Sequence, residues 1–347
     1  MSRTKVIFLA AALFSFILLI SCGGFRSAAA ESKKKQESSQ VSSTAVTDSV
    51  FPPQNISGII QWGEGGGTDE LMRPLAALAE KELGVPMLVE NMSGGAGAIA
   101  MQYVYDQAPD GSTLLMGAEN PALYRELGIL DLTYQNFECV LLIGDETTAV
   151  TVGKNAPYSS LRELCKAAEA GKEITMATTG TGGLPWEVGA MLNGITGVSF
   201  DQIQYDSDAS ALAAVLHGEC DFTVCKLQAC LPDYRNGDLE LLCMISDTAS
   251  EQAPEVRPVT EEYPEFAQYL PWGPFYGVFV REGTDKERTE RLSEAFRKAF
   301  LDPDYQGLLK ERGVNPMGLT GAEAEKYLVS WHTNTVDALR KAGAVVP

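Results

Sequence analysis

The chain has 347 residues, a formal net charge of −19 at pH 7 and a hydrophobic content of 45%. This composition excludes a nucleic-acid-binding protein, because phosphate recognition needs a basic face and the sequence has no basic stripe. The length is sufficient for two domains.

The first 22 residues have the pattern of an export signal. Arg3 and Lys5 precede an apolar run over residues 6–20. The run is shorter than the roughly 20 residues of a membrane span, which favours a secretory signal over the alternative of an uncleaved span. The stretch "LISC", which ends at Cys22, resembles a bacterial lipobox. We therefore expect a lipoprotein signal peptide over residues 1–22, with lipidated Cys22 anchoring an extracytoplasmic protein to a bacterial membrane, on its periplasmic or cell-surface side.

Residues 23–50 are small and polar and include three consecutive lysines. Such a composition cannot bury enough apolar surface to offset the entropy of ordering, so we predict a flexible tether. The folded part is then expected from residue 51 to the C-terminus.

The folded part begins with a repeated order of strand, glycine-rich loop and helix. Strands are predicted over residues 56–62, 86–90 and 112–116, and helical spacing follows the first two of them. This alternation indicates a mostly parallel sheet with right-handed crossovers. Ligands usually bind in loops at the carboxyl ends of such strands, here residues 65–68, 94–97 and 117–120.

The same order returns after about residue 150. A helix capped by Ser159 or Ser160 leads to a strand over residues 174–177 and to the glycine loop "TTGTGG". Further predicted elements are strands over residues 203–205, 221–225 and 239–245 and a helix capped by Asp208 or Ser210. Two units with the same design would face their glycine loops toward each other.

The C-terminal part is expected to return to the first unit. A strand over residues 272–280 precedes helices at about 285–300, 302–312 and 321–342. The predicted division is a first lobe of residues 51–150 plus 273–347 and a second lobe of residues 151–272. The chain would then cross between the lobes twice, which creates a hinge and a ligand cleft.

The first glycine loop, within "QWGEGGGTD", is followed by no Lys. Glycines let a backbone approach a ligand closely, and the amides of a helix N-terminus bind an anion without a basic side chain. The chain lacks GxxxxGK[ST], which excludes a P-loop NTPase, and the glycine spacing fits a dinucleotide-binding GxGxxG poorly. The loop therefore indicates a site for an acid group.

Seven stretches follow one another from about residue 56 to the C-terminal part: "WGEGGGTDELMRPLA", "GVPMLVENMSGGAGAIAMQYV", "APDGSTLLMG", "APYSSLRELCKAA", "TTGTGG", "IQYDSDASALAAVLHGECDF" and "FVREGTDKERTERLSEAF". Together they resemble the extracytoplasmic solute receptors of the tripartite tricarboxylate transporter family. The resemblance implies an α/β protein with the type II periplasmic-binding-protein fold, two lobes that close on a small carboxylate. It also implies delivery of that solute to a membrane permease, with no cofactor.

The resemblance further implies which residues line the ligand site. They are Gly65, Gly66, Gly67, Thr68 and Asp69 of the first loop, with Trp62 beside it; Ala118, Glu119 and Asn120; Thr179, Gly180, Thr181 and Gly182; and Tyr205 and Asp206. Other roles stay open for some of these residues. Asp69 and Asp208 are also suited to cap helices, Thr179 and Thr181 to satisfy turn backbone, and Trp62 to fill core space.

The predicted site is rich in acids: Glu64, Asp69, Glu119, Asp206 and Asp208. Family members commonly place a His after the second glycine loop, where this chain has Leu184, Pro185 and Trp186. Acids repel a multiply charged carboxylate unless a cation or a ligand amine balances them. Among dicarboxylates, tricarboxylates and acidic or zwitterionic amino acids, we therefore expect a ligand of low net negative charge.

The remaining reactive residues indicate neither an enzyme nor a metal site. The six Cys other than Cys22 are expected to be free thiols or to form one or two disulfides, because no CxxC pair or His cluster supports zinc. His217 and His332 are predicted at helix surfaces, and the chain lacks GxSxG and HExxH. A ligand-sensing adaptor for a signalling partner is the alternative to a transport receptor, and an exported enzyme is disfavoured.

Overall fold

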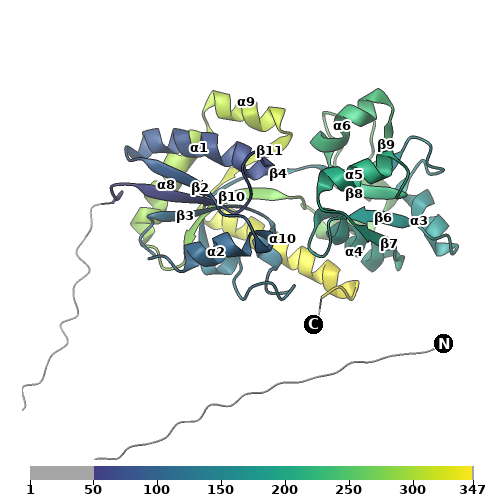
Figure 1. Cartoon of the computed structure of the whole chain (residues 1–347), viewed down its shortest axis with the longest axis horizontal. Coiled ribbons are helices and arrows are strands. Elements are labelled where there is room, and N and C mark those ends of the chain that lie inside the picture. The colour runs from purple at the N-terminus through teal and green to yellow at the C-terminus, as the bar shows by residue number, and fades with distance from the viewer. Residues whose placement is uncertain (1–50, 346–347) are drawn as a thin grey trace, which may run out of the picture. The chain divides into compact units, whose positions relative to one another are not determined.

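The computed structural model describes residues 51–345, which form two mixed β-sheets with helices on both faces of each (Figure 1). The predicted signal peptide, the lipidation of Cys22 and the tether lie outside the described residues. The two sheets are named sheet A and sheet B below.

Sheet A has six strands in the order β11-β4-β10-β3-β1-β2. Strands β1 (Ile56–Ile60), β2 (Met87–Asn91) and β3 (Thr113–Ala118) pair in parallel. Strand β10 (Phe275–Arg281) is antiparallel to both β3 and β4 (Phe137–Glu146), and β11 (Val314–Leu319) is antiparallel to β4. The chain therefore builds this sheet from both its N-terminal and its C-terminal part.

Sheet B has five strands in the order β7-β6-β8-β5-β9. Strands β6 (Thr175–Thr178), β7 (Asp201–Gln204) and β8 (Phe222–Lys226) pair in parallel, while β5 (Thr148–Gly153) is antiparallel to β8 and to β9 (Leu239–Met244). Each sheet thus combines a parallel trio with antiparallel strands.

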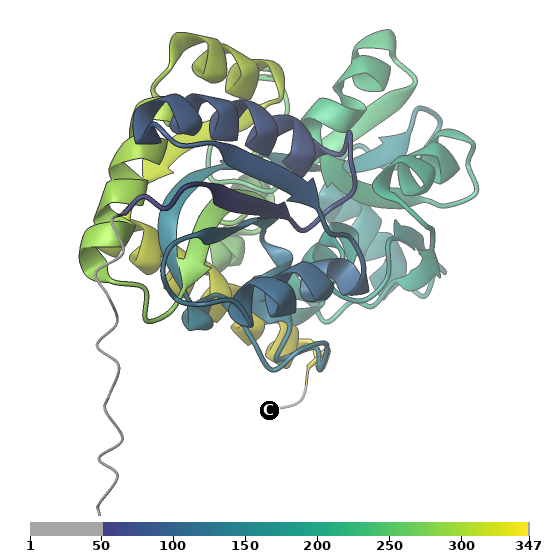
Figure 2. The ribbon, with the colours of Figure 1, turned by 60° about the vertical axis from the view of Figure 1, so that its left-hand side comes forward.

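The helices cover each sheet from two sides. Over sheet A, α1 (Gly67–Leu83), α8 (Lys286–Phe300) and α9 (Pro303–Glu311) lie on one face, and α2 (Ala98–Tyr105) and α10 (Gly321–Lys341) on the other (Figure 1). Figure 2 brings this sheet forward and shows α1 lying alongside β1 and β2, with α8 and α9 next to it. Over sheet B, α5 (Asp208–Leu216) and α6 (Leu227–Asn236) lie on one face, and α3 (Leu161–Glu169) and α4 (Leu184–Thr196) lie on the opposite face.

Short helical turns complete the described residues. They are η1 (Gly95–Gly97), η2 (Asn120–Leu123), η3 (Tyr134–Asn136), α7 (Val259–Glu262) and η4 (Pro264–Tyr269).

Side-chain alternation along the strands explains this layering. Ile56 and Ile60 on β1 pack into the apolar cluster of α1, α8 and α9, whereas Ile59 packs into the cluster that contains α2 and α10. The latter cluster continues under sheet B, where it includes Val150 and Phe222. One of the apolar clusters therefore packs against a face of both sheets.

The predicted strands and helices of the two glycine-loop units are present, with ends shifted by a few residues. Two predicted caps are wrong: Gly66 rather than Asp69 caps α1, and Ser207 caps α5 in a reciprocal pair with Ser210. No prediction covered β4, β5, α6 or β11, and the sheets are mixed rather than mostly parallel.

The cysteines of the described part are free thiols: Cys139, Cys165, Cys220, Cys225, Cys230 and Cys243. No group of His, Cys, Asp and Glu in residues 51–345 is arranged to hold a metal ion. Across the same residues, every helix is too short or too polar to cross a bilayer.

Candidate functional site

Several predicted site residues lie at the carboxyl ends of parallel strands. Because Ile60 on β1 is in register with Met116 on β3, the loops that follow these two strands leave the same edge of sheet A. The second glycine loop, residues 179–183, leaves β6, and Tyr205 and Asp206 follow the adjacent parallel strand β7. These edges are the usual ligand-binding positions in α/β sheets.

The carboxylate of Asp69 forms the hydrogen bonds that hold the first glycine loop in place. Its carboxylate accepts hydrogen bonds from the Gly65 amide at 3.0 Å, from Arg73 Nε at 2.8 Å and from Asn91 Nδ2 at 2.9 Å. Burial raises the pKa of this carboxyl, but the bonds from Gly65 and Asn91 and the charge of Arg73 outweigh it, so the net pKa is lowered. Asp69 therefore shapes the loop and is already paired with a cation.

The start of α1 presents backbone amides in the first loop. Gly66 is the N-cap, and no side chain within the described residues caps it. The first amides of a helix lack intrahelical acceptors and lie at the positive end of the helix dipole. A Cβ added to Gly67 would lie 3.5 Å from the Tyr276 hydroxyl. Because Tyr276 belongs to β10, the start of α1 lies next to that strand.

The second glycine loop has the same design at α4. Gly183 is the N-cap, the Gly183 amide donates to the Gly180 carbonyl at 3.1 Å, and the Gly180 amide donates to Thr178 Oγ1 at 3.3 Å. Asn120 Nδ2, which follows β3, donates to the Gly182 carbonyl at 3.4 Å. This bond brings the predicted site residues of sheet A and sheet B together.

The other predicted residues contribute backbone or stand apart. The Trp62 carbonyl accepts a bond from Asn91 Nδ2 at 2.8 Å, and the Ala118 carbonyl accepts one from the Tyr134 hydroxyl. The Tyr205 hydroxyl is directed to Glu219 and Cys220 on its own unit, at 3.4 Å from each. Thr181 and Asp206 are exposed.

An ion-pair network between the two sheets was missed by the sequence reasoning. Lys226 at the end of β8 lies 2.5 Å from Glu146 Oε2 at the end of β4. Lys226 Nζ also donates to the Tyr276 hydroxyl at 2.7 Å, and that hydroxyl donates to Glu146 Oε2 at 2.7 Å. The available signal was a charged residue placed directly after the apolar strand "DFTVC".

Electrostatics link this network to the loops. Burial raises the pKa of Glu119 to about 7 even though Lys226 opposes the shift, and Glu146 and Asp208 add to it. Burial and the nearby Glu119 raise the pKa of Glu187, in the first turn of α4, well above its usual range. Glu187 is 2% exposed, and its Oε1 has no hydrogen-bond partner among residues 51–345. The site thus joins one lysine with several carboxyl groups.

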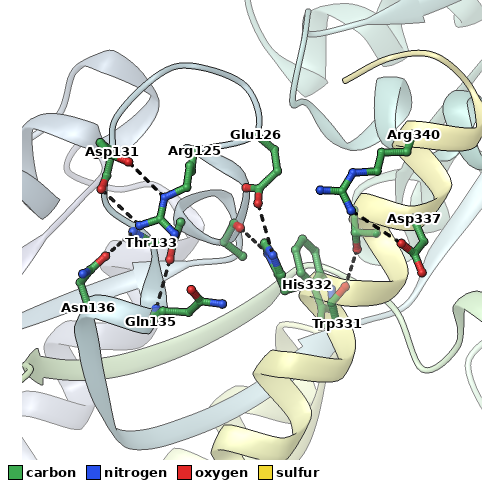
Figure 3. Close-up of polar contacts among 12 residues, drawn as sticks. Arg125, Glu126, Asp131, Thr133, Gln135, Asn136, Trp331, His332, Asp337 and Arg340 are labelled. Carbon is green, nitrogen blue, oxygen red and sulfur yellow. Dashed lines mark hydrogen bonds and ion pairs between the residues drawn. The ribbon is translucent and has the colours of Figure 1, made fainter. Parts of the chain in front are cut away.

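His332 is held away from this region. On α10, its Nδ1 lies 2.7 Å from the Ala122 carbonyl and its Nε2 lies 3.4 Å from Glu126 (Figure 3). The His332 ring is half-buried on α10, and His217 at the end of α5 is exposed. His332 also borders a pocket of about 960 Å³ between α8 and α10, which none of the predicted site residues lines.

Known proteins match this chain over most of its length. Residues 71–341 match the model of the tripartite tricarboxylate transporter family receptor. Protein BugT of Bordetella pertussis is 24% identical over 307 residues, which cover 86% of this chain and 92% of that protein.

Solved structures show the same fold. A solute-binding protein from Polaromonas has a TM-score of 0.72 at 22% identity, covering 84% of this chain and 99% of its own. MatC from Rhodopseudomonas palustris, solved with bound malate, has a TM-score of 0.66 at 22% identity, covering 85% of this chain and all of its own. The two-sheet α/β architecture is therefore that of periplasmic binding proteins.

Proposed function

Because this chain belongs to the tripartite tricarboxylate transporter receptor family, we propose that it captures a small carboxylate-bearing solute outside the cytoplasm and delivers it to a membrane permease. The family consists of solute-binding receptors rather than enzymes. A receptor of this kind needs a site that grips an acid group, and the two glycine loops meet that requirement.

The observation that carries the proposal is the contact between the loop after β3 and the second glycine loop, because the first glycine loop leaves the same edge of sheet A as the loop after β3. Asn120 contacts Gly182 directly, and the helices α1 and α4 that follow the loops both begin at a glycine N-cap. A negative charge at the N-terminus of such a helix is stabilised by about 0.3–1 kcal/mol, and by more where water is excluded. A carboxylate between the loops would be held by backbone donors from both sides.

The ligand class follows from the charges around these loops. We propose a carboxylate of low net negative charge, because the acids Asp206 and Asp208 follow β7 next to the strand that leads into the second glycine loop, and the Lys226 cation is already paired with Glu146. The relative MatC binds malate, which supports a small dicarboxylate or an acidic amino acid as the first candidates. Tricarboxylates carry more charge than the site favours.

The two-lobed division and the anchor are part of the same proposal. Residues 51–150 plus 273–347 would form one lobe and residues 151–272 the other, closing on the solute through contacts that exist only in the closed state. Lipidated Cys22 would hold the receptor at the membrane. Incorporation of labelled fatty acid into the wild-type chain, and its loss in Cys22→Ala, is the expected result for the anchor.

Thermal denaturation of the full chain in detergent tests the function. A ligand that binds only the native state raises the melting temperature by mass action. We expect such a rise with malate, succinate, aspartate or glutamate, and a smaller one with citrate. If none of these acids raises the melting temperature, the proposed function is wrong.

A matched glycine pair tests the location of the site. Gly67→Val places a side chain beside the Tyr276 hydroxyl at the start of α1, whereas Gly307→Val places the same side chain on α9 with no atom within 4 Å of its Cβ. We expect Gly67→Val to abolish the ligand-dependent rise and Gly307→Val to keep it. Retention of the rise in Gly67→Val would place the solute elsewhere.

A further inference from the structure

Lys226 lies at the point where the two sheets meet. Lys226 is the last residue of β8 and the N-cap residue of α6. The first residue of β5 pairs with Lys226, and only one residue separates β5 from Glu146. The Lys226 ammonium pairs with Glu146 at 2.5 Å and with the Tyr276 hydroxyl at 2.7 Å, and both partners belong to sheet A. Lys226 is therefore fixed at this junction by partners from the opposite sheet.

The proposed site residues surround this lysine. Lys226 donates a hydrogen bond to the Tyr276 hydroxyl. That hydroxyl lies next to the start of α1, 3.5 Å from the position of a Cβ on Gly67. The Lys226 charge also acts on Glu119 after β3 and on Asp208 at the start of α5. Three separate loops of the proposed site thus lie close to one cation.

The ammonium retains capacity for a ligand. An ammonium group has three N–H donors, and Glu146 and Tyr276 occupy two of them. The Lys226 side chain is 30% exposed, whereas the Glu146 side chain is 10% exposed. In this pair the Lys226 side chain is therefore the more exposed partner, and the Glu146 carboxylate that partly neutralises its charge is the more buried one.

We propose that Lys226 is a specificity-determining residue of the solute site, which donates its remaining N–H to a carboxylate oxygen of the solute. This inference rests on the proposed carboxylate-binding function. Glu146 acts as an internal carboxylate that shares the lysine with the solute and limits the strength of that contact. The site then binds acids through one partly neutralised cation in addition to backbone amides.

This arrangement makes opposite predictions for the two partners. Glu146→Gln removes the competing charge and leaves the lysine, so carboxylate affinity should rise by about threefold to tenfold. Lys226→Met should weaken binding by at least about tenfold. Because Lys226→Met leaves a buried carboxylate unpaired and can impair folding, the double variant Lys226→Met with Glu146→Gln removes the pair without leaving that charge.

Titration calorimetry of the full-length chain with succinate and malate is the test. The matched control is the exposed ion pair of Lys154, which follows β5, and Asp238, which precedes β9. The two charged groups are 2.9 Å apart, and the control variant is Lys154→Met with Asp238→Asn. We expect the control to bind as the wild type does, the double variant to bind more weakly, and Glu146→Gln to bind more tightly.

The outcomes separate the two proposals. If the wild type binds these acids and the Lys226→Met with Glu146→Gln variant binds them equally well, the assignment of Lys226 is wrong while the receptor function stands. If Glu146→Gln fails to tighten binding, Glu146 does not mask the lysine and the inference is overturned. If the wild type binds none of the acids, the function itself fails, and the inference fails with it.

Discussion

At the residue scale, Asp69 connects the first glycine loop to the rest of sheet A. Its carboxylate holds Gly65, Arg73 and Asn91 at once, and its side chain is almost fully buried. Asp69→Ala should therefore lower the free energy of unfolding by about 2 kcal/mol, because it leaves a charged donor and two polar donors without their acceptor. Urea denaturation measures this loss.

Glu64 provides the control for Asp69. It lies exposed in the same loop, so Glu64→Ala should change the free energy of unfolding by less than about 0.5 kcal/mol. Equal losses for the two variants would show that the Asp69 contacts contribute little to stability.

Glu119 makes the stability depend on pH. Its pKa is raised from 4.5 to about 7, so the folded state binds more protons than the unfolded state between these values. The stabilisation is complete below about pH 4.5 and is lost as the pH rises through 7. Burial of Glu187 acts in the same direction. We expect the unliganded protein to lose about 1–2 kcal/mol between pH 5.5 and pH 8.

Denaturation of Glu119→Gln over the same pH range checks the assignment. The variant has no proton to release at this position, so its free energy of unfolding should vary less than that of the wild type. A profile as steep as the wild-type one would assign the pH dependence to other groups.

Single residues were predictable from the sequence only where local spacing determines their position. The glycines of both loops follow apolar strands directly, so their place at the sheet edges could be predicted. Asp69 was expected to contact the ligand or cap the helix, because its partners Arg73 and Asn91 are brought together only by the packing of α1 on β2. Lys226, Glu146 and Tyr276 are separated by up to 130 residues, and no local pattern joins them.

At the element scale, β4 and β11 show what periodicity does not reveal. Strand β4 is buried on both faces, so it lacks the polar and apolar alternation of a surface strand, and β11 contains Pro316 and Gly318. Their pairing is close at Gly144, where a Cβ would lie 2.1 Å from the Asn315 carbonyl oxygen. The antiparallel side of sheet A thus depends on a contact between segments far apart in the chain.

Gly144→Ala should therefore separate β11 from β4. The clash is with backbone, which cannot rotate away, so we expect a loss of about 2–4 kcal/mol in the free energy of unfolding. Gly307→Ala on α9 is the control of opposite sign, because no atom lies within 4 Å of its Cβ and Ala favours helix over Gly by roughly 0.5–1 kcal/mol. Urea denaturation of both variants is the measurement. A loss of stability in Gly144→Ala alone indicates the steric clash, whereas a loss in both variants would indicate that neither glycine tolerates a side chain.

At the scale of the described residues as a whole, α10 and the shared apolar core tie the two sheets together. Trp331 on α10 is 1% exposed, stacks on Trp272 with ring centroids 6.4 Å apart and donates to the Gly273 carbonyl at 2.9 Å. Further along α10, the position of a Cβ on Gly194 of α4 lies 3.4 Å from Lys341 Cβ. One helix of the C-terminal part thus contacts elements of both sheets.

A core shared by both sheets should unfold in one step. We expect coincident thermal transitions by circular dichroism and tryptophan fluorescence, and Trp331→Ala should lower the free energy of unfolding by about 3–5 kcal/mol while keeping a single transition. Val329→Ala, on the same helix but 52% exposed, should have little effect. Two separated transitions in Trp331→Ala would mean that sheet A and sheet B fold independently and that α10 alone couples them. In that case the contacts of Lys226 with Glu146 and Tyr276 would form only after both sheets have folded.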